Sequence, residues 1–170
     1  KDEEKERERA ERERLREERK AQQEMARERQ RLEKEQAHYR NVLEALLAKG
    51  DEEGAARLRE QLAEIDRAIA DVDYRAANVR AGYVYVISNV GAFGEDVVKI
   101  GLTRRLDPME RVRELGDASV PFRYDVHALF FSDDAVGIEQ ELHRRLDDRR
   151  INRVNLRREF FRVSPAVVKR

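Results

Sequence analysis

The sequence GYVYVIS at residues 82–88 decides the fold of the second half of this chain. A shorter apolar run, VVKIG, follows at residues 97–101, and a glycine-containing stretch, residues 89–94, separates the two. Both runs are rich in the β-branched and aromatic residues that favour strands, so they predict a β-hairpin. Because side chains alternate along a strand, Tyr85 and Lys99 are expected to share one face and to meet across the pair.

Further along the chain, the pattern alternates between helix and strand. Asp107 followed by Pro108 is typical of the start of a helix, residues 124–131 have the composition of a third strand, and residues 133–146 predict a second helix. The run EFF at residues 159–161 is interpreted as a final short strand or turn that packs a phenylalanine into the sheet. This order predicts an α+β fold, a small sheet with helices packed on it.

Residues 1–80 have a different composition and predict a charged helical stalk. Residues 1 to about 34 are almost wholly Glu, Arg, Lys, Gln and Ala, which are good helix formers, and neither Gly nor Pro interrupts them. A sparse heptad then begins, formed by Met25, Leu32, Tyr39 and Leu46. The stalk is therefore expected to be helical and to need a partner for its apolar face.

A turn near residues 50–54 supplies that partner, because Gly50 and Gly54 there flank acidic residues suited to the start of a new helix. After the turn, apolar residues recur four and three apart, at Leu58, Leu62, Ile65, Ile69, Val72, Ala76 and Val79. The pattern predicts an antiparallel coiled coil between this helix and residues 35–49. We therefore divide the chain into a stalk, residues 1–80, and a domain, residues 81–170.

Composition limits the classes of function. Charged residues make up 42% of the chain and aromatic residues only 6%, which excludes one compact globule with an ordinary core. The absence of cysteine excludes disulfides, thiolate metal sites and cysteine nucleophiles, and it fits a cytoplasmic location. No apolar run approaches the ~20 residues that a membrane span needs. Because the chain starts at Lys1 rather than Met, a membrane tether upstream stays open.

Several runs within residues 82–163 carry a family resemblance. They are GYVYVISN (82–89), VVKIGLTRRLDP (97–108), GDASVPF (116–122), EQELH (139–143) and REFF (158–161). Together they resemble the GIY-YIG nuclease superfamily, in a bacterial and phage branch associated with phage defence in which the domain follows a charged coiled coil. Two positions depart from the superfamily pattern, since Tyr83 stands in place of a Gly and Lys99 in place of a Tyr.

The resemblance implies a three-stranded antiparallel sheet flanked by helices. It also implies a metal-dependent endonuclease that hydrolyses DNA phosphodiester bonds, here in defence against phage or foreign DNA. Cleavage of that kind needs a base to deprotonate water, cations to hold the developing phosphorane charge, and a divalent metal ion. The chain offers a candidate for each of these three needs.

Five residues match or adjoin the superfamily's catalytic positions. Tyr85 matches the tyrosine assigned as general base, and Tyr83 precedes it in the same motif. Lys99 is the cation expected to favour the phenolate of Tyr85, since a free tyrosine has a pKa near ~10. Arg111 matches the phosphate-binding arginine. Glu139 matches the metal-binding glutamate, and its carboxylate suits Mg²⁺ or Mn²⁺.

Other polar residues surround this set. Glu141 points roughly 200° away from the metal-binding glutamate around the same helix, so only one of the two can face the site. His127 and His143 are hypothesised to contact the phosphate or the leaving group, although a lone strand histidine is more often structural. Asn152 or Asn155 is the candidate for the superfamily's late asparagine, and the spacing favours Asn152.

The distribution of charge indicates DNA as the partner. Residues 144–170 contain ten Lys or Arg and three acids, which makes a surface suited to phosphates. Arg104, Arg105 and Arg150 are predicted to contact the DNA backbone, which positions a duplex without reading its sequence. The stalk holds 20 basic and 22 acidic side chains in residues 1–80, so it is interpreted as a spacer or as a coiled coil that joins copies of the chain.

Two alternatives stay open on the sequence alone. The first is a DNA-binding module that does not cleave, which the lysine at position 99 favours and the presence of Tyr85, Arg111 and Glu139 opposes. The second is an adaptor protein whose coiled coil is the functional part. Assembly that depends on concentration, without affinity for nucleic acid, would select the adaptor.

Overall fold

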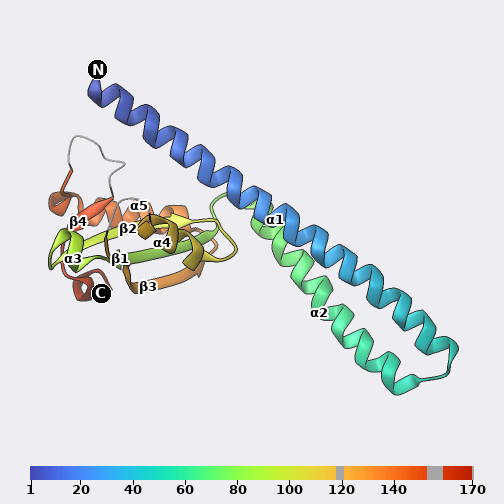
Figure 1. Cartoon of the computed structure of the whole chain (residues 1–170). Coiled ribbons are helices and arrows are strands. Elements are labelled where there is room, and N and C mark those ends of the chain that lie inside the picture. Colours follow the sequence, from blue (N-terminus) through green and yellow to red (C-terminus); the bar gives the residue numbers. More distant parts are fainter. Residues whose placement is uncertain (118–120, 153–158, 170) are drawn as a thin grey trace. The chain divides into compact units, whose positions relative to one another are not determined.

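Two long helices make up the first half of the chain, and a sheet with short helices makes up the second (Figure 1). The computed structural model describes residues 1–117, 121–152 and 159–169. The chain divides into two compact units, Gln22–Val79 and the combination of Lys1–Ala21 with Arg80–Arg170. No helix in these described ranges is long and apolar enough to cross a membrane. The predicted α+β class is confirmed.

Two residues set the turn between α1 (Asp2–Ala48) and α2 (Glu52–Ala77). Gly50 has a φ of 74°, in the left-handed region that glycine adopts without steric cost, and it follows the end of α1. Asp51 caps α2, because its side chain accepts a hydrogen bond from the backbone N–H of Gly54 at 2.9 Å. The turn lies where the sequence predicts it, but Gly54 lies inside α2 rather than in the turn.

Within the unit Gln22–Val79, the two helices are buried along the predicted apolar stripe, at Met25, Leu32, Leu58, Ile65 and Val72. Polar pairs flank the stripe, with Arg29 donating to Asp73 at 2.7 Å and Gln36 donating to Asp66 at 2.5 Å. The antiparallel pairing therefore starts earlier in α1 than the predicted residues 35–49. It also ends earlier in α2, because the helix stops before Val79, which is 64% exposed.

The sheet has four strands in the order β3-β1-β2-β4, and every pair is antiparallel. The three predicted strands are β1 (Gly82–Ser88), β2 (Val97–Thr103) and β3 (Asp125–Ser132), with β3 starting one residue later than expected. A fourth strand, β4 (Phe160–Arg162), extends the three-stranded sheet that the family resemblance implies. A short helix, α3 (Val90–Phe93), occupies the connection predicted as a turn.

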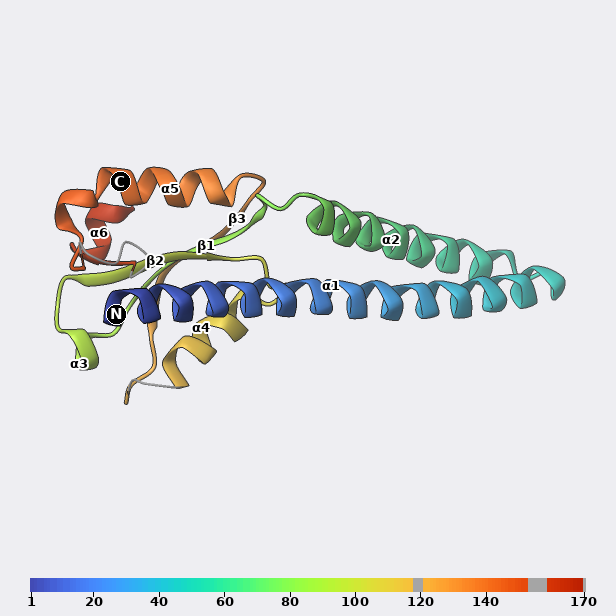
Figure 2. The same cartoon turned by 90° about the horizontal axis from the view of Figure 1, so that it is seen from above.

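Short helices complete this unit: α4 (Pro108–Asp117), α5 (Ala135–Arg145), the 3-10 turn η1 (Asp147–Arg149) and α6 (Pro165–Val168). In Figure 2, α5 and α6 lie on one side of the sheet and α4 on the other. Asp107 starts α4 as predicted, because its carboxylate accepts from the backbone N–H of Met109 at 3.1 Å. Asp134 caps α5 in the same way, accepting from the N–H of Gly137 at 3.1 Å.

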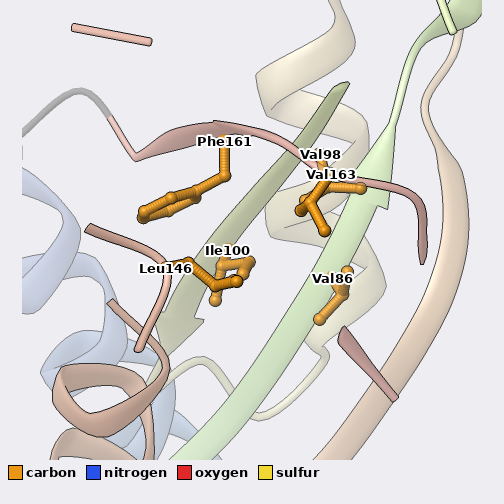
Figure 3. Packing of buried hydrophobic residues seen from close by; sticks show 6 residues of the cluster. All are labelled: Val86, Val98, Ile100, Leu146, Phe161 and Val163. Atoms are coloured by element: carbon orange, nitrogen blue, oxygen red, sulfur yellow. The ribbon is translucent and has the colours of Figure 1, made fainter. Parts of the chain in front are cut away.

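The main core lies between the sheet and the α5–α6 side (Figure 3), and it consists of Val86, Val98, Ile100, Leu146, Phe161 and Val163. Phe161 of β4 is fully buried there, which confirms the predicted packing of residues 159–161. A smaller cluster on the α4 side contains Tyr85, Ile87 and Val112. The sheet therefore has two packed faces, and Tyr85 belongs to the face under α4.

We predict that Phe161→Ala destabilises the sheet unit by about 3–5 kcal/mol, because it removes a large side chain that the surrounding core cannot refill. Urea denaturation followed through the near-ultraviolet signal of the tyrosines measures this loss. Val167→Ala is the matched control, since Val167 is 44% exposed on α6 and its truncation should change stability by less than about 0.5 kcal/mol. Equal losses for the two variants would contradict the assignment of Phe161 to the core.

Candidate active site

Gly101 has no side chain, and the hydroxyl of Tyr85 lies in the space that a side chain at this position would occupy. Gly101 of β2 lies directly opposite Tyr85 of β1. A Cβ at this position would collide with the hydroxyl of Tyr85 and would lie 2.8 Å from Oε2 of Glu159. Lys99 and Gly101 share the face of Tyr85, as predicted, but the register pairs Lys99 with Ile87 rather than with Tyr85. The phenol hydroxyl and a glutamate carboxylate therefore meet over one glycine.

Strand β4 brings Glu159 to this point. The backbone N–H of Ile100 donates to the carbonyl of Glu159 at 3.0 Å, which places Glu159 next to Gly101 along the edge of β2. Its carboxylate lies 3.5 Å from Nζ of Lys99, and that ammonium also lies 5.1 Å from the ring centroid of Phe160. Lys99 is thus the ionic partner of Glu159.

Helix α5 supplies two further groups, Glu139 and His143, which are four residues apart and share one face of the helix. Nε2 of His143 lies 2.9 Å from the carbonyl oxygen of Ile100. Because a carbonyl only accepts, Nε2 must carry the proton and donate it. The lone pair of Nδ1 is then left on the side of Glu139, whose Oε1 is 3.9 Å away.

One side-chain atom from each of Glu139, His143 and Glu159 lies within 4.8 Å of the other two. We call this group the Glu–His–Glu cluster. Two carboxylate oxygens and one imidazole nitrogen are donors that a divalent cation accepts. The hydrogen bond from His143 to a backbone carbonyl is the arrangement that usually fixes the ring of a metal-binding histidine. The cluster therefore fits a divalent metal ion.

Burial and mutual repulsion set the protonation of these groups. Burial, followed by the charge of Glu159, raises the pKa of Glu139 to about 8, against a smaller lowering by Lys99. Burial lowers the pKa of His143, which favours the neutral ring that can bind a metal. Because two negative carboxylates repel each other, Glu139 and Glu159 stay close at neutral pH only when they share a proton or bind a cation.

Tyr85 is fully protonated in this environment. Burial raises its pKa well above the usual value, and the charge of Glu159 raises it further, while Arg111 acts in the opposite direction. Lys99, the cation predicted to favour the phenolate, is paired with Glu159 at 3.5 Å. Arg111 is the cation whose charge favours the phenolate.

Arg104 and Arg105, which follow β2, and Arg111 of α4 have carboxylate partners from two sources. Glu110 and Glu114 of α4 lie 3.4 and 2.9 Å from Arg105. Glutamates of α1 contact the arginines as well, and these contacts are Arg104 with Glu18, Arg105 with Glu17 at 3.2 Å, Arg111 with Glu17 at 3.5 Å, and Arg111 with Glu13 at 3.3 Å. Arg104 and Arg105, which the sequence predicts as contacts of the DNA backbone, are buried, and glutamates of α1 are among the groups that cover them.

Glu139 and Glu141 face different ways, as the helical periodicity predicts. The side chain of Glu141 is 44% exposed, and its carboxylate accepts from Arg144 and Arg145 at 2.7 and 2.8 Å. These ion pairs lower the pKa of Glu141 to about 2. The pairs also occupy two of the arginines in the basic C-terminal region.

The remaining predicted residues lie outside the cluster. Tyr83 lies opposite Thr103 and packs edge-on against Phe131, with ring centroids 5.4 Å apart. His127 contacts Ser88, with Nε2 2.6 Å from the hydroxyl oxygen. Both residues thus have structural contacts on the β1–β3 side of the sheet.

Arg150 is a structural residue rather than a surface cation. Its guanidinium lies 4.9 Å from the ring centroid of Phe161, its Nε lies 3.3 Å from Asp147, and its side chain is buried. Asn152 is partly buried just after it. Asn155, the alternative to Asn152, lies outside the residues that the structure describes.

Comparison with known proteins adds one finding. Residues 82–170 match the family described as the T5orf172 domain. Neither the curated proteins nor the solved structures contain a match. The matched region begins at the first residue of β1 and includes every member of the Glu–His–Glu cluster.

We predict that the stability of the metal-free protein falls as pH rises from about 4.5 to about 8. Glu139 loses its proton near 4.5 in the unfolded chain and near 8 in the folded one, so the folded state alone holds that proton within this interval. Melting temperatures measured in EDTA across this range, for the parent and for Glu139→Gln, test the statement. The variant should lose much less stability, whereas identical pH profiles would show that Glu139 does not hold the proton.

Proposed function

The chain belongs to the T5orf172 domain family, and from this premise we propose that residues 82–170 form a metal-dependent DNA endonuclease of the GIY-YIG type. The family is phage-associated and related to nucleases, which agrees with a nuclease or DNA-binding role. The convergence of Glu139, His143 and Glu159 beside the hydroxyl of Tyr85 is the observation that carries the proposal.

The cluster is suited to Mg²⁺ or Mn²⁺. Two carboxylates satisfy the preference of both ions for oxygen, and the imidazole nitrogen of His143 is a ligand that Mn²⁺ accepts more readily than Mg²⁺ does. When bound, such an ion supplies positive charge that stabilises the developing charge on a phosphoryl oxygen. Lys99 lies 3.5 Å from Glu159, so it restrains that carboxylate in the orientation needed for binding.

Arg111 and Tyr85 are the groups that face the substrate in this proposal. Arg111 has the geometry to donate two hydrogen bonds to a phosphate, and its charge reaches Tyr85. The charges of Glu159 and Glu139 raise the pKa of Tyr85, and a bound dication offsets them. The phenol oxygen is therefore a base for the attacking water only in the metal-loaded site.

The biological role that we propose is defence against phage or foreign DNA in the cytoplasm. The phage association of the family supports this role. The hairpin of α1 and α2 then acts as a spacer, or joins copies of the chain.

A DNA-binding module that does not cleave is the second candidate. The observation in its favour is the buried Tyr85, whose pKa is raised rather than lowered. Binding without cleavage in Mg²⁺ and in Mn²⁺ would select this candidate.

We expect the full chain to nick plasmid DNA in Mg²⁺ or Mn²⁺ and not in EDTA. Glu139→Ala removes a metal ligand and Tyr85→Phe removes the proton acceptor, so each should lower the rate by at least about 10²-fold. Glu141→Ala is the matched control, because Glu141 lies on the same helix but is exposed and paired with Arg144 and Arg145. Equal activity of Glu139→Ala and Glu141→Ala would contradict the proposed site.

His143→Ala should weaken Mn²⁺ binding by at least about tenfold, because it removes the nitrogen donor from the cluster. Titration of Mn²⁺ followed by electron paramagnetic resonance measures the affinity without requiring cleavage. His127→Ala should leave the affinity unchanged, since His127 contacts Ser88. If both histidine variants bind Mn²⁺ like the parent, His143 is not a ligand.

A further inference from the structure

Ion pairs join the start of α1 to residues 80–170. Within the unit formed by Lys1–Ala21 and Arg80–Arg170, none of residues 1–20 is buried, and Leu15 is 54% exposed. The contacts of this segment with the arginines are ion pairs made by Glu13, Glu17 and Glu18. Ion pairs at a protein surface are individually weak, so another polyanion can replace the glutamates.

The position of Glu17 shows which groups this helix engages. Its carboxylate lies 3.2 Å from Arg105, 3.5 Å from Arg111 and 3.3 Å from the hydroxyl of Thr103. Two guanidinium groups and a hydroxyl are the donors that protein sites use to hold a phosphate. Glu17 also acts on Tyr85, because its charge contributes to raising the tyrosine pKa. A carboxylate of α1 thus lies where a phosphate of the substrate would be bound.

The glutamates of α1 neutralise the arginines that they contact. Arg104, Arg105 and Arg111 carry three positive charges against the two carboxylates of α4, Glu110 and Glu114. Without α1, these five side chains therefore carry one excess positive charge. Helix α1 adds three carboxylates and one ammonium, that of Lys20, which lies 3.6 Å from Glu114. Among the groups joined by these ion pairs, the charges then sum to one negative, so the positive charge of the arginines toward a phosphate is cancelled.

We propose that Glu13, Glu17 and Glu18 of α1 act as an intramolecular competitor for DNA, occupying the arginine surface that binds phosphates and keeping the site closed to weakly bound nucleic acid. This inference rests on the proposed function, because it concerns regulation of the same site. Attachment through one chain gives the glutamates a high effective concentration at the arginines. A long duplex still displaces them, since it offers many phosphates at high charge density.

The test compares two triple variants of the full chain, each of which removes three negative charges. In the first, Glu13→Gln, Glu17→Gln and Glu18→Gln remove the competing carboxylates. In the second, Glu44→Gln, Glu60→Gln and Glu64→Gln change exposed glutamates of the hairpin for which the described residues show no ion pair. Circular dichroism shows whether the helices persist. Binding to a short fluorescein-labelled DNA duplex is then measured in EDTA, where cleavage does not interfere.

The first variant should bind the duplex on the order of tenfold more tightly than the parent, because its arginines are free to contact phosphates. The second should bind less than about threefold more tightly, as expected for net charge alone. Equal gains for the two variants, or no gain for the first, would overturn the inference. Because binding is measured without metal, it is informative even if the protein fails to cut DNA. If the protein cuts DNA but the first variant binds the duplex no more tightly than the parent, the nuclease proposal is retained and only the proposal of an intramolecular competitor is contradicted.

Discussion

The close approach of two strands at Gly101 is the constraint on which the site depends. Tyr85 lies opposite this glycine, and the missing side chain leaves room for both the phenol hydroxyl and the carboxylate of Glu159. Any larger residue would force one of these groups away. The backbone bond between Ile100 and Glu159 then fixes β4 to β2, and the carbonyl of Ile100 orients His143. Two neighbouring residues of β2, Ile100 and Gly101, thus set the positions of Tyr85, Glu159 and His143.

The cluster combines groups that repel one another. Glu139 and Glu159 are partly buried and close together, so at neutral pH they need a shared proton or a cation. Lys99 offsets this repulsion only in part, since its ammonium contacts Glu159 at 3.5 Å. The repulsion between Glu139 and Glu159 does not stabilise the fold. The position of this pair beside Tyr85 supports the metal site that we propose.

Much of the fold was predictable because many helices and strands are marked by patterns of residues close together in the sequence. The Asp107 cap, the apolar stripe of α2 and the two strand runs each carry their own signal, and each appears in the structure. The family resemblance selected Glu139 over Glu141, and the structure places them as that choice requires. The register of β1 and β2 was not predictable, because the connection that sets it contains the unpredicted helix α3, and Gly101 rather than Lys99 therefore faces Tyr85. Glu159 was missed because its contact with β2 joins segments far apart in the sequence, although it is one of only three acids in the basic stretch 144–170.

Diffraction from crystals of the full chain soaked in Mn²⁺, recorded with anomalous scattering, tests the central claim most directly. The account predicts a manganese peak bonded to Glu139, to Nδ1 of His143 and to Glu159, at about 2.1–2.3 Å from each atom. A peak at other residues, or no peak while the three side chains keep the positions described, would contradict the assignment of this cluster as the metal centre.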